Sequence, residues 1–147
     1  MKAKVKWVQG RTFIGSTETG HSLVLGRAVA EGEPQPGPSP MELVLIGTGG
    51  CAAFDVVHIL EKGRERVTDC VVELQAERAT TDPKVFVRIH MHFVVSGSAL
   101  DPAKVARAIQ LSAEKYCSAS AMVGKTAKIT HDFEIRDAAP AAAKAAS

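Results

Sequence analysis

Residues 39–62 read Ser-Pro-Met-Glu-Leu-Val-Leu-Ile-Gly-Thr-Gly-Gly-Cys-Ala-Ala-Phe-Asp-Val-Val-His-Ile-Leu-Glu-Lys, and this stretch decides the fold. It predicts one long helix from about Pro40 to Lys62. Ser39 is a favoured N-cap residue, a proline suits the first helical position, and Glu42 completes a capping box. The stretch from Leu43 to Leu60 is apolar nearly all the way round, so the helix must be buried on most of its sides.

Strand patterns lie on both sides of this helix. Before it, residues 2–8, 12–17 and 21–25 alternate or are rich in strand formers, which predicts an antiparallel meander. Residues 31–40 contain four prolines and two glycines, so this stretch is predicted to be an exposed loop.

After the helix, two strands are predicted, joined by a turn at residues 80–83. One face of the first carries Cys70, Val72, Leu74 and Ala76, and one face of the second carries Val85, Val87, Ile89, Met91, Phe93 and Val95. A helix from Asp101-Pro102 to about Tyr116, a short helix from Ser118 to Val123 and a strand at 127–136 complete the chain.

The order βββ-α-ββ-α-β is an α+β pattern, because strands follow one another in runs. We expect a single domain over residues 1–137 and a disordered tail over residues 138–147. One small sheet cannot cover an almost wholly apolar helix, so we also expect an obligate dimer that buries it.

The composition excludes several classes of partner. The 147 residues are 46% hydrophobic and 23% charged, with a net charge of +2, and no basic stripe points to nucleic acid. The N-terminus alternates charged and apolar residues, unlike a secretory signal, and no uninterrupted apolar run has the length of a membrane span. We therefore expect a cytoplasmic protein that binds neither nucleic acid nor membranes, and no nucleotide motif or cofactor site is recognisable.

Three cysteines remain as candidates for chemistry. Cys51 lies inside the long helix, and plain burial is as good an interpretation as function. Cys117 directly precedes the short helix, where free N–H groups favour a thiolate. Cys70 lies on the apolar face of a strand and is interpreted as core. A reducing cytoplasm favours redox chemistry or burial over structural disulfides.

Other polar groups have simpler explanations. Asp55 and His58 follow Cys51 at i+4 and i+7, but a relay over two turns leaves His58 about 10 Å away along the helix axis. His58 is better explained as a packed or hydrogen-bonded residue. His90 and His92 alternate on the polar face of one strand and could clamp a metal, but no third ligand is apparent, so we interpret them as a solvated face.

The motifs at Gly37–Leu45, Gly49-Gly-Cys51 and Ala113-Glu-Lys-Tyr-Cys117-Ser resemble those of the OsmC/Ohr superfamily, with the YhfA-like branch the nearest. The resemblance covers nearly the whole chain. It implies an intertwined homodimer with two long central helices and active sites at the subunit interface.

The better-studied members of that superfamily are thiol peroxidases for organic hydroperoxides. The resemblance implies that Cys51 is the peroxidatic cysteine and Cys117 the resolving one, with an external dithiol, such as a lipoyl-bearing protein, as reductant. The family carries a catalytic Glu directly after the motif proline, where this chain has Met41, so Glu42 is the candidate carboxylate. The family arginine has no clear counterpart, and Arg27 is the one basic residue between the third strand and the helix.

Three functions therefore remain open. The chain could be a peroxidase of organic hydroperoxides in oxidative-stress defence, with Cys51 attacking and Cys117 resolving. It could be a non-catalytic dimer that binds a small hydrophobic or thiol ligand at its interface. It could also be a structural dimer with inert cysteines. We favour the peroxidase, because the chain has a cysteine at both redox positions of the family.

Overall fold

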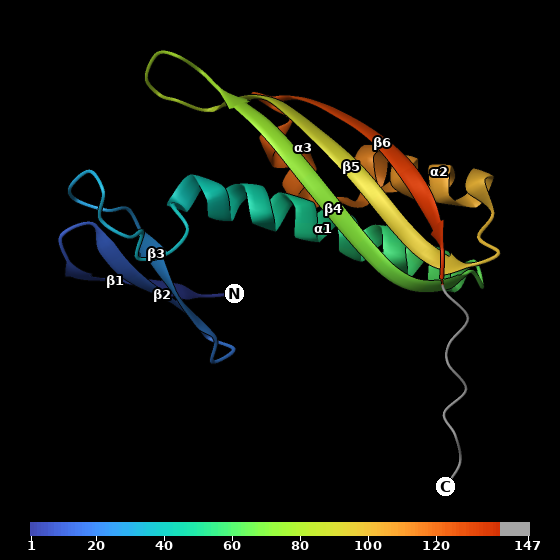
Figure 1. Ribbon diagram of the computed structural model, residues 1–147, viewed down its shortest axis with the longest axis horizontal. Coiled ribbons are helices and arrows are strands. Elements are labelled where there is room, and N and C mark those ends of the chain that lie inside the picture. The colour runs from blue at the N-terminus through green and yellow to red at the C-terminus, as the bar shows by residue number, and fades with distance from the viewer. Residues whose placement is uncertain (139–147) are drawn as a thin grey trace, which may run out of the picture. The chain divides into compact units, whose positions relative to one another are not determined.

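The computed structural model describes residues 1–138. These residues form two three-stranded sheets and four helical segments (Figure 1). In chain order these are β1 Ala3–Gln9, β2 Thr12–Thr17, β3 Ser22–Gly26, α1 Pro40–Lys62, β4 Arg66–Arg78, β5 Phe86–Ser98, α2 Pro102–Leu111, η1 Ser112–Tyr116, α3 Ser118–Val123 and β6 Lys128–Asp137. The predicted α+β order is confirmed, and the long helix has the predicted bounds.

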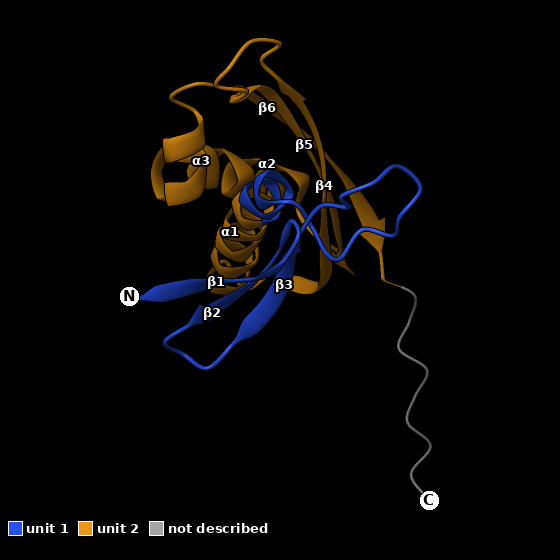
Figure 2. Ribbon diagram, turned by 90° about the vertical axis from the view of Figure 1, so that its left-hand side faces the viewer, with its two compact units in different colours: residues 1–46 blue, residues 47–147 orange. Residues whose placement is uncertain are grey.

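The chain forms two compact units, one ending at Ile46 and the other beginning at Gly47 (Figure 2). In the first unit, β1, β2 and β3 form the predicted antiparallel meander, with Trp7 opposite Phe13 and Phe13 opposite Leu25. The proline-rich segment between β3 and α1 contains neither helix nor strand, as predicted. A single domain over residues 1–137 stays a prediction, and the expected tail lies outside the described residues apart from Ala138.

The second unit is a sheet with helices on one face. The strand order is β4-β5-β6, with β4 antiparallel and β6 parallel to the central strand β5. Both views place the helices on the same side of this sheet (Figures 1 and 2). The parallel pairing is possible because α2, η1 and α3 carry the chain back to the starting end of β5 before β6 begins.

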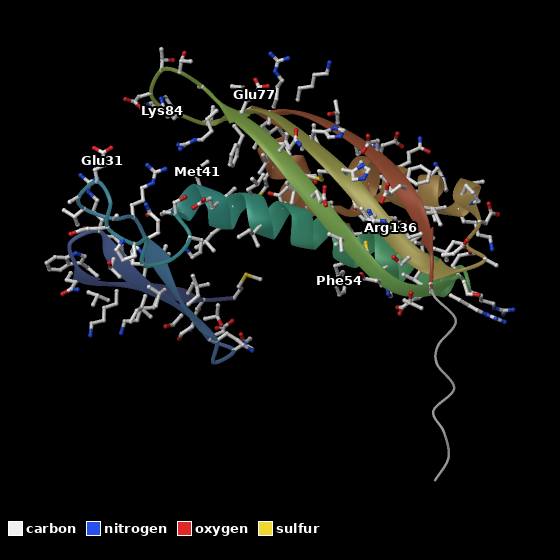
Figure 3. The ribbon with its side chains drawn as sticks, in the orientation of Figure 1. Glu31, Met41, Phe54, Glu77, Lys84 and Arg136 are labelled. Carbon is white, nitrogen blue, oxygen red and sulfur yellow. The ribbon has the colours of Figure 1, made fainter. Side chains whose placement is uncertain are left out.

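One stripe of α1 packs in the core. Its buried residues in this unit are Thr48, Gly49, Ala52, Val56 and Leu60. A Cβ atom built on Gly49 would lie 2.6 Å from Leu74 Cδ1 of β4, so the glycine lets the helix approach the sheet closely. The expectation that α1 is buried on most sides is not met within one chain, because Phe54 is 72% exposed (labelled in Figure 3).

The length and overall apolar composition of α1 are also those of a membrane span. Asp55 interrupts the apolar run, however, and the buried stripe packs against β4. Both features are typical of a core helix in a packed domain.

Local irregularities displace two predicted elements. A register shift opposite Glu77 and Arg78 directs the side chain of Phe86 into the core and leaves Val87 exposed. The prediction that Val87 shares one face with Ile89 and Met91 was therefore wrong. The helix predicted to reach Tyr116 is α-helical only to Leu111 and then becomes a π-helical turn. Asp101 caps α2 as expected, accepting the N–H of Ala103 at 2.8 Å.

Glu65 ties the start of α2 to the end of α1. Its carboxylate accepts the Lys104 ammonium at 2.6 Å and the Asp101 backbone N–H at 2.9 Å. These two hydrogen bonds, that of Lys104 first, hold the pKa of Glu65 below its ordinary value.

Replacing Glu65 with Gln should lower the melting temperature at pH 7 by a few degrees. Because the pKa of folded Glu65 is depressed, its stabilisation is complete above the unfolded pKa of about 4.3 and is lost as the pH falls through the folded value. Thermal unfolding followed by circular dichroism between pH 7 and pH 3 should show the difference between variant and wild type shrinking below about pH 4. Glu61→Gln, at an exposed position of α1, is the control, and a pH-independent difference would contradict the assignment.

Candidate functional site

Two cysteines and a carboxylate meet in the second unit. Cys51 and Asp55 lie one turn apart on α1, and Cys117 lies between η1 and α3. The two sulfur atoms and a carboxylate oxygen all lie within 4.8 Å of one another. The structure thus brings together the two cysteines that the sequence singled out, although 66 positions (117 − 51) separate them.

A π-helical turn positions Cys117. In η1 the backbone N–H of Cys117 donates to the carbonyl oxygen of Ser112 at 2.9 Å, five residues back. The backbone then becomes extended at Cys117, with φ −71° and ψ 98°, before α3 begins. Such turns widen a helix by one residue and are frequent at functional sites.

Cys117 is the N-cap residue of α3, as predicted from Ser118. Its sulfur accepts the hydroxyl of Ser120 at 3.0 Å and the Ser120 backbone N–H at 3.3 Å. The side chain is buried, with 3% of its surface exposed. Burial raises the pKa of the Cys117 thiol, the Ser120 hydrogen bonds oppose this rise, and Cys51 adds to it.

The two thiols of the cluster differ in their exposure. Cys51 is more exposed than Cys117 and faces it from α1. Cys70 is half-buried on β4, where burial raises its pKa first and Asp69 second, in keeping with its interpretation as a core residue.

Asp55 is a site residue whose role the sequence left open. Ser112, which is almost fully buried, donates its hydroxyl to Asp55 Oδ2 at 3.2 Å and so orients the carboxylate toward the sulfurs. The i+4 spacing from Cys51 pointed to Asp55, whereas nothing in the sequence pointed to Ser112 or Ser120. The two thiols and the carboxylate are also donor types that bind zinc.

His58 is not part of this cluster. Its ring stacks on Phe54, with the centroids 6.1 Å apart and the planes 15° apart, on the exposed side of α1. The interpretation of His58 as a packed residue is thereby supported.

Glu42 is engaged in the first unit. Its carboxylate accepts the Ser39 backbone N–H at 2.7 Å, and its own N–H donates to Ser39 Oγ at 3.3 Å, which completes the predicted capping box. Hydrogen bonding to Ser39, and then the charge of Arg27, hold its pKa below the ordinary value. Glu42 precedes Cys51 by nine residues in the sequence of α1 and belongs to the other compact unit. Met41, which directly follows the motif proline where the family carries its catalytic Glu, is labelled near the start of α1 in Figure 3.

Two cavities adjoin the cluster. One, of about 240 Å³, reaches Ser112 and Ser120 and is otherwise mainly apolar, with Ala52, Met91, Phe93, Ile109 and Ile129 in its wall. The other, of about 430 Å³, is lined by Asp55, His58, Ile59, Lys62, Leu111 and Tyr116. A small hydrophobic molecule fits the character of the first, and the second opens onto the carboxylate.

Comparison with known proteins agrees with this architecture. The family model described as OsmC-like protein matches residues 31–132. Protein YhfA of Escherichia coli K12 is 48% identical over 135 residues, covering 92% of this chain and 98% of YhfA. A crystal structure of a hypothetical protein from Aquifex aeolicus VF5 superposes with a TM-score of 0.82 at 29% identity, covering 94% and 97% of the two chains.

A more distant likeness shows the fold alone. The organic hydroperoxide resistance protein OhrB of Bacillus subtilis superposes with a TM-score of 0.61 at 21% identity, over 91% of this chain and 98% of OhrB. The family model spans both compact units and the cysteine cluster, and YhfA matches over almost its whole length. The chain therefore belongs to the family of OsmC-like proteins.

Proposed function

We propose that this protein is a thiol-dependent peroxidase that reduces organic hydroperoxides in oxidative-stress defence, with Cys51 and Cys117 as its redox pair. The observation that carries the proposal is the approach of the two sulfurs to within 4.8 Å of each other and of Asp55. Formation of a disulfide requires the two sulfurs to come from this separation to about 2.05 Å.

Cys51 carries out the first step. Its thiolate sulfur attacks the outer oxygen of the hydroperoxide, the O–O bond breaks, and the alkoxide takes up a proton to leave as an alcohol. Cys51 is oxidised to a sulfenic acid. The half-exposed position of Cys51 and the raised pKa of buried Cys117 favour this assignment of roles.

Cys117 carries out the second step. Its sulfur attacks the Cys51 sulfenic acid, an S–S bond forms, and the hydroxyl leaves as water with the Cys117 proton. An external dithiol, such as a lipoyl-bearing protein, then reduces the disulfide by thiol–disulfide exchange and is itself oxidised. Ser120 assists by donating two hydrogen bonds to the Cys117 sulfur, which stabilise its anionic form.

Asp55 supplies the carboxylate at the sulfurs. Its Ser112 hydrogen bond holds it in place to accept a thiol proton and return it to the departing oxygen. Glu42, engaged with Ser39, acts in this proposal as the cap of α1.

A homodimer in the cytoplasm completes the proposal. Apolar side chains of α1 remain exposed within one chain, notably Phe54 on the side away from the buried stripe. A second copy of the same helix is the partner that would bury them, in the manner that the family resemblance implies.

The runner-up is a non-catalytic dimer that binds a small hydrophobic or thiol ligand. The apolar cavity of about 240 Å³ next to Ser112 and Ser120 favours this alternative, as does Met41 at the family's carboxylate position. In that case the cysteines bind the ligand or stay inert.

Cumene hydroperoxide should consume two of the three thiols of the wild-type protein, because Cys51 and Cys117 pair while Cys70 is spared. Cys51→Ser should lose none, and Cys117→Ser should lose one, trapped as a sulfenic acid by dimedone. Thiol counting with a chromogenic disulfide checks this, and Cys70→Ser is the matched control that should still lose two. If the wild type and Cys51→Ser lost equal numbers of thiols, the proposed peroxidase activity would be wrong. If neither lost any thiol and the protein bound an apolar probe, the result would support the runner-up.

Ser120→Ala should slow the closing of the disulfide several-fold without slowing the oxidation of Cys51. The lost hydroxyl would otherwise stabilise the Cys117 thiolate, so its removal raises the pKa of that thiol further. Stopped-flow dimedone trapping should then find more Cys51 sulfenic acid at early times. Ser118→Ala is the control, because the hydrogen bonds to the Cys117 sulfur among the described residues come from Ser120 and not from Ser118. An unchanged sulfenic-acid yield in Ser120→Ala would remove Ser120 from the mechanism.

Phe54→Glu should convert the dimer to monomers, since a charge on the exposed face of α1 cannot be buried against a second apolar helix. Light scattering measures the mass directly. Val71→Glu, an exposed apolar residue of β4 on the sheet face that points away from the helices, should leave the dimer intact. A wild-type protein that scatters as a monomer at micromolar concentration would end the dimer hypothesis.

A further inference from the structure

The thiol cluster of the second unit also contains the donor atoms of a metal site. Cys51 Sγ, Cys117 Sγ and a carboxylate oxygen of Asp55 all lie within 4.8 Å of one another. Cys51 and Asp55 are four residues apart on α1, so both side chains project from the same face of the helix. The two histidines of metalloprotease helices bind zinc with this same spacing. Cys117, at the junction of η1 and α3, adds a third donor from a separate part of the fold.

The distances between the three donors suit a small tetrahedral ion. Zinc lies about 2.3 Å from a cysteine sulfur and about 2.1 Å from a carboxylate oxygen, so neighbouring donors of a tetrahedral site are about 3.6–3.8 Å apart. None of the three separations here exceeds 4.8 Å, so each pair has to approach by about 1 Å at most. A disulfide requires a sulfur–sulfur distance of about 2.05 Å. The reduced cluster is therefore nearer to the geometry of a metal site than to that of a disulfide.

Buried serines already orient two of the three donors. The hydroxyl of Ser112 donates to Asp55 Oδ2 at 3.2 Å. The hydroxyl and the backbone N–H of Ser120 donate to Cys117 Sγ at 3.0 and 3.3 Å. Both serine side chains are buried. Metal ligands typically have hydrogen-bonding partners of this kind, which fix the ligand atoms and raise the affinity for the ion.

The charge of the cluster favours a cation. Among the ion pairs of residues 1–138 none includes Asp55, so no basic side chain neutralises this carboxylate. Lys62 lines the same cavity as Asp55 without forming an ion pair with it. When Cys51 and Cys117 bind a metal they do so as thiolates, so the ligands carry three negative charges, of which a divalent ion neutralises two.

A cavity gives the ion access to the cluster. Asp55 lines the cavity of about 430 Å³, which has room for water molecules. Zinc sites with three protein ligands take a water as the fourth. His58 lines this cavity too, but its ring stacks on Phe54, so a water is the better candidate for the fourth position.

We propose that Cys51, Cys117 and Asp55 of the reduced protein bind one divalent ion of the zinc class, and that the bound ion protects the cysteine pair from oxidation. Thiolate donors select zinc and similar ions, whereas calcium and magnesium prefer oxygen alone. The two thiol protons pass to solvent when the ion binds, and neither the ion nor the sulfurs change oxidation state. Both sulfurs that would form the disulfide are ligands, so the ion and the disulfide exclude each other. The protective role rests on the proposed peroxidase function, whereas the binding of the ion does not.

Cobalt(II), which replaces zinc in thiolate sites, tests binding in the untagged full chain kept reduced by a phosphine. The reduced wild type should bind one ion per chain and develop a sulfur-to-cobalt charge-transfer band in the near ultraviolet, which added zinc should remove by displacement. Protein oxidised with diamide should show no band. Absence of the band from the reduced wild type at saturating cobalt would overturn the proposal without recourse to any variant.

Variants identify the donors. Cys51→Ser and Cys117→Ser should each weaken zinc binding at least about tenfold and lose roughly half of the cobalt band, and Asp55→Asn should weaken binding at least about tenfold with the band retained. Cys70→Ser, outside the cluster, and His92→Ala, on an exposed histidine that pairs with an aspartate elsewhere on the sheet, are the controls that should bind as the wild type does. A full band in the Cys51→Ser/Cys117→Ser double variant would overturn the site.

Thiol counting separates the protective role from the peroxidase activity. At saturating zinc, cumene hydroperoxide should consume the thiols of Cys51 and Cys117 roughly tenfold more slowly than in the metal-free protein, because the sulfurs are bound. Equal rates with and without zinc would overturn the protective role. A metal-free protein that loses no thiols to the hydroperoxide, yet shows the cobalt band, would refute the peroxidase function and support the metal site.

Discussion

The close packing of α1 on the sheet is the constraint on which the rest of the second unit depends. Because Gly49 has no side chain, the helix can pack closely against Leu74. Ala52, Val56 and Leu60 continue the buried stripe at intervals of three and four residues. Cys51 and Asp55 each stand one position before a stripe residue, or about 100° around the helix. They therefore lie at the flank of the contact, where η1 and α3 can meet them; a helix turned by one residue would press the thiol into the sheet.

The second half of the site depends on a departure from regular structure. A continuous α-helix through Cys117 would bond its N–H four residues back, whereas the π-turn bonds it to Ser112, five residues back. The same serine holds Asp55 through its hydroxyl, so one residue positions both the cysteine and the carboxylate. Burial of the Cys117 side chain raises the pKa of its thiol. The positions of Cys117 and Asp55 thus both depend on Ser112, at the start of this irregular turn.

The two faces of strand β5 have different surroundings, because successive side chains alternate between them. Met91 and Phe93 line the apolar cavity beside the cysteine cluster, and His90 and His92 face outward to Asp132. Parallel pairing with β6 is decisive for both faces: it brings Ile129 to the cavity and Asp132 to the histidines. An antiparallel or slipped β6 would separate these groups, since a one-residue slip exchanges the two faces.

Local patterns in the sequence determined the long helix to its end residues, the N-terminal meander and the cap at Asp101, and they singled out Cys51 and Cys117 as candidates. Each rests on signals within a few positions of one another: the capping box of Ser39 and Glu42, period-two strands, and residues that begin helices. Only the tertiary structure decided the parallel place of β6, the bulge that exposes Val87, the π-turn and the partners Ser112, Ser120 and Asp132. These arise from contacts between segments far apart in the chain, and a one-residue bulge or widened turn changes little in the local pattern while it redirects every side chain beyond it.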